Sequence, residues 1–386
     1  MSLAQILKSK VVSQLDITKE LTDQEIQEKI DNLIIQQGKE TYLSLGEKES
    51  LSREVFNSLR RLDILQELIE DPGISEIMVN GTENIFIEKR GEIFQWHKKF
   101  DSYKKLEDMI QQVVSKSNRR INDANPIADA RLQNGERVNI VLYPIALNGP
   151  IITIRKFPKK VITMKELIHV HTLTQEVAEF LKYLVVQGYN IFISGGTSSG
   201  KTTFLNALSE FIPLNERIIT IEDSAELQIV NHPNLVRLEA RTASIEGNYE
   251  ITIRDLIRTS LRMRPDRLIV GEVRGGEALD MLQAMNTGHD GSLSTGHSNS
   301  TKDMISRLET MVLMGTEIPL EAVKRQISAG IDIILHLERM KDGSRKVVEI
   351  SEIGEVREGE VQLFQLFTRE NKKAELRRCK DLKRKR

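Results

Sequence analysis

The sequence predicts an α/β fold, with a mostly parallel sheet in the C-terminal half and a smaller α+β domain before it. Three observations lead to this prediction. From about residue 166 onward, short apolar strands alternate with helical segments, which is the order of a parallel sheet covered by helices on both faces. Between residues 71 and 157, the apolar period is two and turn signals separate the runs. Residues 1–70 instead repeat their apolar positions at helical spacing.

The length and the changes of pattern divide the chain into parts. A chain of 386 residues is long enough for two or three domains, and it contains no internal repeat. We expect a helical region at 1–70, an α+β domain at 71–157, a linker at 158–165, an α/β domain at 166–368 and a basic tail at 369–386.

Local signals place the elements within these parts. Thr22 and Glu25 form a capping-box pattern before an apolar helical face, and Asp71-Pro72-Gly73 ends the helical region. Asn80-Gly81 is a two-residue hairpin signal. We expect a helix at 103–117, strands at 137–142, 151–157, 190–194, 217–221, 235–238 and 268–270, helices at 253–261, 277–285 and 301–314, and shorter antiparallel strands after Ile331.

Composition excludes several classes of protein. The formal net charge is -1, which gives no reason to expect nucleic-acid binding. The single cysteine, Cys379, excludes an intramolecular disulfide and fits a reducing cytosol. No apolar run is long enough for a membrane span or a signal peptide, so we expect a cytoplasmic protein that reaches membranes through partners. We expect the basic tail to be solvated; the alternative is weak contact with anionic lipid or an acidic partner.

The strongest motif is a phosphate-binding loop. It fits G-x-x-x-x-G-K-[ST] and lies between a predicted strand and a predicted helix. In such loops, backbone N–H groups and the positive end of the helix bind phosphate oxygens. We therefore expect ATP and Mg²⁺, with Lys201 on the β- and γ-phosphates and the Thr202 hydroxyl on the metal. The expected binding residues are Gly195, Gly196, Thr197, Ser198, Ser199, Gly200, Lys201, Thr202 and Thr203.

Two carboxylates follow predicted buried strands. Glu222 comes after Ile218–Ile221, and Glu272 comes after Leu268–Gly271. Carboxylates at the carboxyl ends of parallel strands lie at the rim where ligands bind. The spacing leaves their division of roles open. We expect Glu222 as the general base and Glu272 near Mg²⁺; the alternative is that both are surface acids.

Two of the seven histidines, His289 and His297, flank a short predicted strand in a glycine-rich stretch. We interpret them as a sensor, in which an imidazole contacts the γ-phosphate or its water and reports hydrolysis. A structural pair is the simpler alternative. Zinc binding is a third, but it needs a further ligand and no cysteine lies nearby.

These motifs together resemble a known family. The run LRMRPDRLIVGEVRG at 261–275 is similar to the secretion ATPases of the type II/type IV secretion superfamily, and most similar to their CpaF-type branch, which powers tight-adherence pili. Residues 288–300 resemble the family's histidine box and 221–223 its aspartate box. Residues 129–132 and 135–139 resemble its N-terminal-domain motif. The resemblance covers about residues 70 to 365.

The resemblance implies a fold and a mechanism. It implies a RecA-like C-terminal domain, a PAS-like N-terminal domain, nucleotide between the two, and a ring of six subunits. By position, Arg137 and Arg155 look like the arginines that the N-terminal domain brings to the phosphates, with Arg131 assisting; the alternative is that they point into water. The implied function is a motor for type II/IV secretion or pilus assembly that works with an inner-membrane platform protein.

Other functions remain open at this point. A nucleic-acid translocase of a conjugation or DNA-uptake system would use the same loop, although the near-neutral charge and 5% aromatic content argue against direct DNA contact. A small-molecule kinase would lack a separate upstream domain carrying arginines. A non-catalytic nucleotide sensor would not need Glu222 and Glu272. The sequence does not identify the transported substrate.

Overall fold

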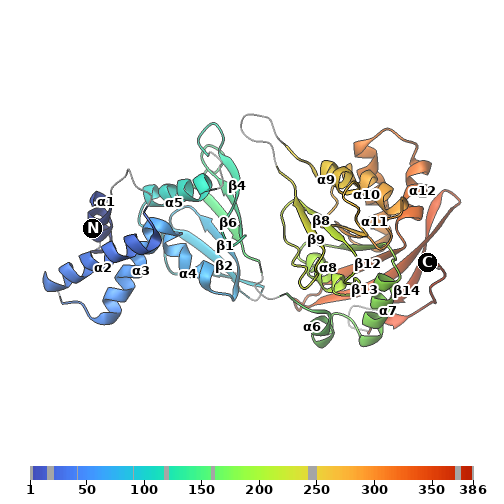
Figure 1. Ribbon diagram of the computed structural model, residues 1–386, viewed down its shortest axis with the longest axis horizontal. Helices are drawn as coiled ribbons and strands as arrows, with labels where there is room; N and C mark the ends of the chain where they lie inside the picture. The colour runs from blue at the N-terminus through green and yellow to red at the C-terminus, as the bar shows by residue number, and fades with distance from the viewer. Residues whose placement is uncertain are drawn as a thin grey trace. The chain divides into compact units, whose positions relative to one another are not determined.

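The chain forms two compact units, residues 1–159 and 160–386, shown in the computed structural model of Figure 1. The boundary between them falls within the expected linker at 158–165. The structure describes residues 3–14, 21–40, 42–89, 91–116, 121–157, 161–241, 250–369 and 375–384. Within these ranges, no helix has both the length and the apolar character that crossing a bilayer requires.

The first unit begins with three helices, α1 (Leu3–Ser13), α2 (Asp23–Glu40) and α3 (Leu45–Arg60). Their apolar stripes meet in a small core of their own, which contains Leu7, Ile30 and Val55. Ser44 begins α3 with a capping box, because its side chain accepts the Glu47 N–H while the Glu47 carboxylate accepts the Ser44 N–H. The turn η1 (Asp63–Leu65) and α4 (Gln66–Glu70) lead into the sheet.

The rest of the first unit is a six-stranded antiparallel sheet with the order β3-β2-β1-β6-β5-β4. Alternate strand residues, such as Ile77, Val138 and Ile154, pack against the apolar face of α5 (Tyr103–Lys116). The opposite residues of each strand therefore form the outer face of the sheet. The strands are β1 (Ile74–Asn80), β2 (Asn84–Lys89), β3 (Glu92–Gln95), β4 (Ile127–Arg131), β5 (Arg137–Val141) and β6 (Ile151–Arg155).

The second unit contains a nine-stranded sheet with the order β15-β14-β13-β12-β7-β11-β10-β8-β9. The six strands from β12 to β9 are parallel, and the remaining three are antiparallel. They are β7 (Ile191–Gly195), β8 (Ile218–Glu222), β9 (Leu235–Glu239), β10 (Arg267–Val270), β11 (Leu293–His297), β12 (Ile333–Arg339), β13 (Arg345–Arg357), β14 (Glu360–Thr368) and β15 (Arg377–Arg378). This confirms the predicted fold class.

Helices cover both faces of this sheet (Figure 1). One core joins Ile193 and Ile269 to α6 (Met164–His169), α7 (Gln175–Val186) and α8 (Lys201–Ser209). The other joins Phe192 and Val270 to α9 (Ile253–Ser260), α10 (Glu277–Asn286), α11 (Thr301–Gly315) and α12 (Leu320–Gly330). Strands buried on both faces are the reason that this half of the sequence reads as continuous apolar runs.

The expected antiparallel pairing after Ile331 is confirmed for β12 with β13 and for β13 with β14, but the expectation of short strands away from the parallel sheet was wrong in two respects. β12 is parallel to β7 and completes the parallel part of the sheet. Its residues Ile333 to Leu337 are buried on both faces, so the run belongs to the centre of the sheet rather than to its edge. β13 has 13 residues and is bulged near Ile350.

Most side chains of the basic tail are exposed where the structure describes it, at residues 375–384, but the tail is anchored on the second unit. The buried carboxylate of Asp332 lies 2.7 Å from Nε of Arg384. The same guanidinium donates to the carbonyls of Ser328 and Ala329 at the end of α12. Glu352 accepts the backbone N–H groups of Lys383 and Arg384. These contacts hold the tail on the second unit because Asp332 is fully buried and its charge needs a partner.

We expect Arg384→Met to destabilise the second unit by about 3 kcal/mol, because it leaves a buried carboxylate without its cation. Thermal unfolding monitored by calorimetry measures this. Arg378→Met is the matched control, since Arg378 forms its ion pair with the exposed Asp381 in the described part of the tail. Equal melting temperatures for the two variants would contradict the assigned role of Arg384.

Candidate functional site

The phosphate-binding motif forms the turn between β7 and α8. Gly200 has φ +94° and Ser198 has φ +58°, so two positions of the loop use left-handed backbone. Gly195 must lack a side chain, because a Cβ there would lie 2.5 Å from the carbonyl oxygen of Leu337. The loop therefore wraps tightly and directs its backbone toward one point at the start of α8. This is the geometry of an anion cradle at a helix N-terminus.

Lys201 is held inside this loop. Its side chain donates to the carbonyl oxygens of Gly195 and Gly196, both at 3.0 Å, and lies 3.2 Å from Nδ1 of His297. The residue is only 7% exposed. The ammonium group is thus fixed at the mouth of the loop rather than left mobile in water.

His297 connects the lysine to a carboxylate. Its Nε2 lies 2.7 Å from Oε1 of Glu272, and Arg274 donates to the other oxygen of Glu272 at 2.7 Å. Burial and the nearby Lys201 lower the pKa of His297, so its ring is neutral at neutral pH. The lysine donates to Nδ1, so Nε2 carries the ring proton and faces the Glu272 carboxylate.

The remaining loop residues fit a bound nucleotide with its metal. Thr202 and Thr203 lie in the first turn of α8, Thr197 is exposed, and Ser199 is buried. Among the described residues, the Ser199 hydroxyl oxygen has no hydrogen-bond partner. A buried hydroxyl of this kind, beside glycine backbone and a fixed ammonium, suits phosphate oxygens. For zinc the donors are absent: the described part of the chain has no group of three His, Cys, Asp or Glu placed to hold a metal ion.

The two predicted acids lie at different distances from the loop. β11 separates β7 from β10, and β10 separates β11 from β8. With neighbouring strands about 4.8 Å apart, Glu272 follows a strand about 10 Å from β7, whereas Glu222 ends a strand about 14 Å from β7. The contact through His297 makes Glu272 the acid that the structure joins to Lys201.

Glu222 instead holds the loop that follows it. Its Oε2 accepts the backbone N–H groups of Glu226 and Leu227 at 2.7 and 2.8 Å. Its side chain packs so closely on Gly271 that a Cβ there would lie 2.9 Å from Cγ of Glu222. Burial raises the pKa of Glu222 to about 7, although the two N–H donors act in the opposite direction. One carboxylate oxygen of Glu222 is thus engaged by the loop, while Oε1 has no hydrogen-bond partner among the described residues, and its role as the general base stays a prediction.

The two histidines of the predicted sensor are not brought together. His297 ends β11 beside the phosphate loop, but His289 precedes β11 and lies at the opposite edge of the parallel sheet. There, Nδ1 of His289 contacts the carbonyl oxygen of Ala284 at 3.2 Å. Five strand residues separate the two edges by about 16 Å. The structure therefore does not place His289 beside the phosphate loop of this unit.

The predicted arginines form a row on the outer face of the first unit's sheet. Arg131 pairs in register with Arg137, and Arg137 with Arg155. The row continues across β1 and β2 as Glu76 and Glu88. Like charges directly opposite each other on adjacent strands repel, so an anion beside these three arginines would stabilise them. The structure thus places the three residues side by side on one face of the sheet, and their role toward the phosphates stays a prediction.

Two residues near the loop were not identified from the sequence. Arg345 donates from Nε to the carbonyl oxygen of Ser198 at 3.1 Å, and its side chain covers Gly200. Arg274 bridges Glu272 and, at 3.9 Å, Asp223. Arg274 lies within the motif that carries the resemblance, so its proximity to Glu272 was a usable signal. Arg345 comes from a distant hairpin and gave none.

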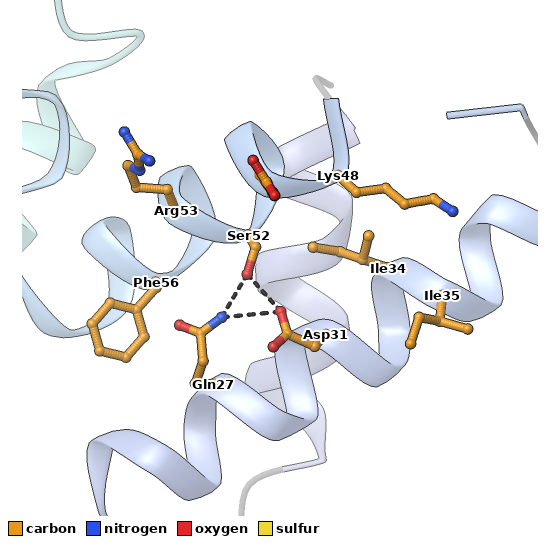
Figure 2. A pocket seen from close by; sticks show the side chains of 9 residues that line it. Gln27, Asp31, Ile34, Ile35, Lys48, Ser52, Arg53 and Phe56 are labelled. Atoms are coloured by element: carbon orange, nitrogen blue, oxygen red, sulfur yellow. Dashed lines mark hydrogen bonds between the residues drawn. The ribbon is translucent and has the colours of Figure 1, made fainter. Parts of the chain in front are cut away.

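A groove of about 530 Å³ lies elsewhere, between α2 and α3 (Figure 2). Gln27 donates to Asp31 and Ser52, and Ser52 donates to Asp31, so these polar side chains satisfy one another. Ile34, Ile35 and Phe56 also line the groove. None of these groups is arranged for catalysis, and we assign the chemistry to the phosphate loop.

Residues 59–380 match the family model described as type II/IV secretion system protein. The chain belongs to this family. A Mycobacterium tuberculosis protein named for conjugal transfer is 32% identical over 326 residues, covering 82% of this chain and 92% of that protein. The type IV secretion system protein VirB11 of Brucella suis is 31% identical over 322 residues, covering 76% of this chain and 88% of VirB11.

Solved structures of this family's fold are also similar. The pilus retraction motor PilT with bound ADP has a TM-score of 0.56 at 23% identity, covering 75% of this chain and 82% of PilT. The ATPase DotB of Legionella pneumophila has a TM-score of 0.52 at 22% identity, covering 74% of this chain and 78% of DotB. The expected superfamily is confirmed, whereas the CpaF-type branch stays a prediction.

We expect Glu222→Gln to stabilise the protein at pH 8.5 by up to about 3 kcal/mol and not at pH 5. The pKa of about 7 means that Glu222 keeps its proton in the folded state at pH values above 4.5, where the same side chain loses it in the unfolded chain. Stability is therefore lost as the pH rises through this window, and the amide removes that loss. Thermal melts at both pH values measure it. Glu355→Gln, at an exposed acid, is the control; an equal gain at both pH values for Glu222→Gln would refute the explanation.

Proposed function

We propose that this chain is the ATP-hydrolysing subunit of a motor that drives type II/IV secretion or the assembly of tight-adherence pili. The observation that carries the proposal is the connected set Lys201, His297 and Glu272, built on a complete phosphate-binding loop. A loop that only bound nucleotide would not need a carboxylate linked to its lysine through a neutral imidazole.

The loop residues would hold the substrate. The backbone of 196–201 and Lys201 would bind the phosphates, and Thr202 would hold Mg²⁺. When bound, Mg-ATP supplies the phosphoryl group and the charge that the metal partly neutralises. The Lys201 ammonium group is already in place for phosphate binding, because it donates hydrogen bonds to the carbonyls of Gly195 and Gly196.

Glu272 is the acid that we propose to orient the attacking water. Its carboxylate is held on one side by His297 and on the other by Arg274. This support sets the direction of its oxygens, which general-base catalysis requires. His297 stands between Glu272 and Lys201 and is therefore placed to sense which phosphates are present. Glu222 takes the supporting role of shaping the loop after β8.

The arginine row of the first unit would act on the same nucleotide. Arg137 and Arg155 would neutralise the charge that develops on the phosphates, with Arg131 beside them. Domain closure over the nucleotide would exclude water and complete the site. By analogy with the family, six subunits would form a ring at the cytoplasmic face of the inner membrane and act on a platform protein there.

One relative favours a second candidate. The Mycobacterium tuberculosis protein named for conjugal transfer raises the possibility of a nucleic-acid translocase. Hydrolysis measured with and without single-stranded and double-stranded DNA separates the two. A motor for protein or pilus subunits is expected to show no stimulation, because the net charge of -1 provides little attraction for DNA.

We expect Glu272→Gln to lower the ATP turnover number roughly 1000-fold, while Glu222→Gln stays within about 10-fold of the parent. Phosphate release from purified, folded protein measures both, and Lys201→Ala is the control that abolishes nucleotide binding. If Glu222→Gln were as inactive as Glu272→Gln, the division of roles proposed here would be wrong. No hydrolysis by the parent protein, under conditions where it binds Mg-ATP, would refute the motor itself.

We expect Arg137→Ala to leave Mg-ATP affinity within a few-fold of the parent and to slow turnover about 1000-fold, because the arginine stabilises charge that develops only during transfer. Isothermal titration and steady-state hydrolysis measure the two effects. Lys99→Ala removes an exposed cation of the same unit and serves as the control. Unchanged turnover in Arg137→Ala would exclude the arginine row from the reaction.

A further inference from the structure

A buried polar chain runs beneath the phosphate loop, on the side away from Glu272. Nδ1 of His336, in β12, lies 2.9 Å from Oγ of Ser194, the residue before Gly195. Ser194 in turn lies 2.5 Å from Oγ of Ser298, which donates to the carbonyl oxygen of Ser300 at 2.8 Å. His336, Ser194 and Ser298 are 3%, 0% and 6% exposed. None of them has been given a role above.

Only one placement of protons satisfies all three contacts. The Ser298 hydroxyl uses its proton on the Ser300 carbonyl, so its oxygen must accept from Ser194. The Ser194 proton is then used, and Nδ1 of His336 must donate to Ser194. Burial lowers the pKa of His336, so the ring is a neutral Nδ1–H donor.

This series of buried hydrogen bonds ends at the segment that carries His297. Ser298 follows His297 directly, and Ser300 caps α11 by accepting the Asp303 N–H. A second contact fixes the same segment, because Thr301 donates to Glu349 of β13 at 2.6 Å. Two neighbouring strands thus hold residues 298–301 from the side opposite Glu272.

We propose that His336 is a positioning residue, which holds His297 at its distance from Lys201 and Glu272 through Ser194 and Ser298. This inference rests on the proposed ATPase function. A buried polar chain is rigid only while every member is satisfied. Without the His336 donor, Ser194 can turn away from Ser298, and the segment behind His297 loses a restraint. His297 is then no longer held within contact distance of both Lys201 and Glu272.

The test compares two variants in the full chain. His336→Met removes the donor and fills the space, whereas His336→Asn keeps a neutral N–H donor at the position of Nδ1. We expect His336→Met to lower kcat for ATP hydrolysis about 10-fold to 100-fold, since small misplacements near reacting groups cost this much. The KM for Mg-ATP should stay within about two-fold, because the loop and Lys201 remain. His336→Asn should recover kcat to within about three-fold of the parent.

Ser298→Ala removes the last link without altering β12 and should reproduce the effect of His336→Met, which keeps the test decisive if the latter does not fold. Ser260→Ala is the control: it removes a different fully buried hydroxyl, bonded only to the Ile257 carbonyl among the described contacts, and should keep the parent kcat. Parent-like kcat in folded His336→Met or in Ser298→Ala, or failure of folded His336→Asn to recover kcat, would overturn the proposal. Inactive parent protein would instead refute the proposed function.

Discussion

The buried ammonium group of Lys201 is the constraint on which the site depends. A charge that is 7% exposed must be satisfied by fixed polar groups. Two of its partners are carbonyls of the loop itself, so the loop shape and the lysine position determine each other. The third is His297, which extends this constraint to Glu272 and Arg274. A single cation thereby organises groups from three neighbouring strands.

The order of strands explains why this is possible. β7 lies in the middle of the parallel sheet, with β11 on one side and β12 on the other. β11 brings His297 level with Gly195, and β12 brings His336 level with Ser194. The loop is therefore supported from both flanks by groups at fixed register. Glu222, one strand further than Glu272, is used for local structure, and its burial fits that use.

The sequence was sufficient where local rules decide. The phosphate loop, the strand before it and the helix after it follow from glycine spacing and apolar runs. The acid at the end of β10 was found for the same reason. What could not be predicted depends on strand order, because pattern alone does not say that β11 separates β7 from β10. That order places Glu272 nearer to the loop than Glu222, whereas the direction of β11 places His289 at the other edge of the sheet. The ion pair between Arg384 and Asp332 was not predicted, because a basic run gives no sign of a buried carboxylate 52 positions earlier.

The row of charged side chains on the sheet of the first unit has arginines at one end and glutamates at the other. Its three arginines lie on β4, β5 and β6, and its two glutamates continue on β1 and β2. Along this row the side-chain charges therefore change sign, from positive on β4, β5 and β6 to negative on β1 and β2. A polyanion that approaches the row would be steered toward its arginine end before any contact forms. Since the Debye length is about 8 Å at physiological ionic strength, this guidance is short-ranged and fades as salt is added.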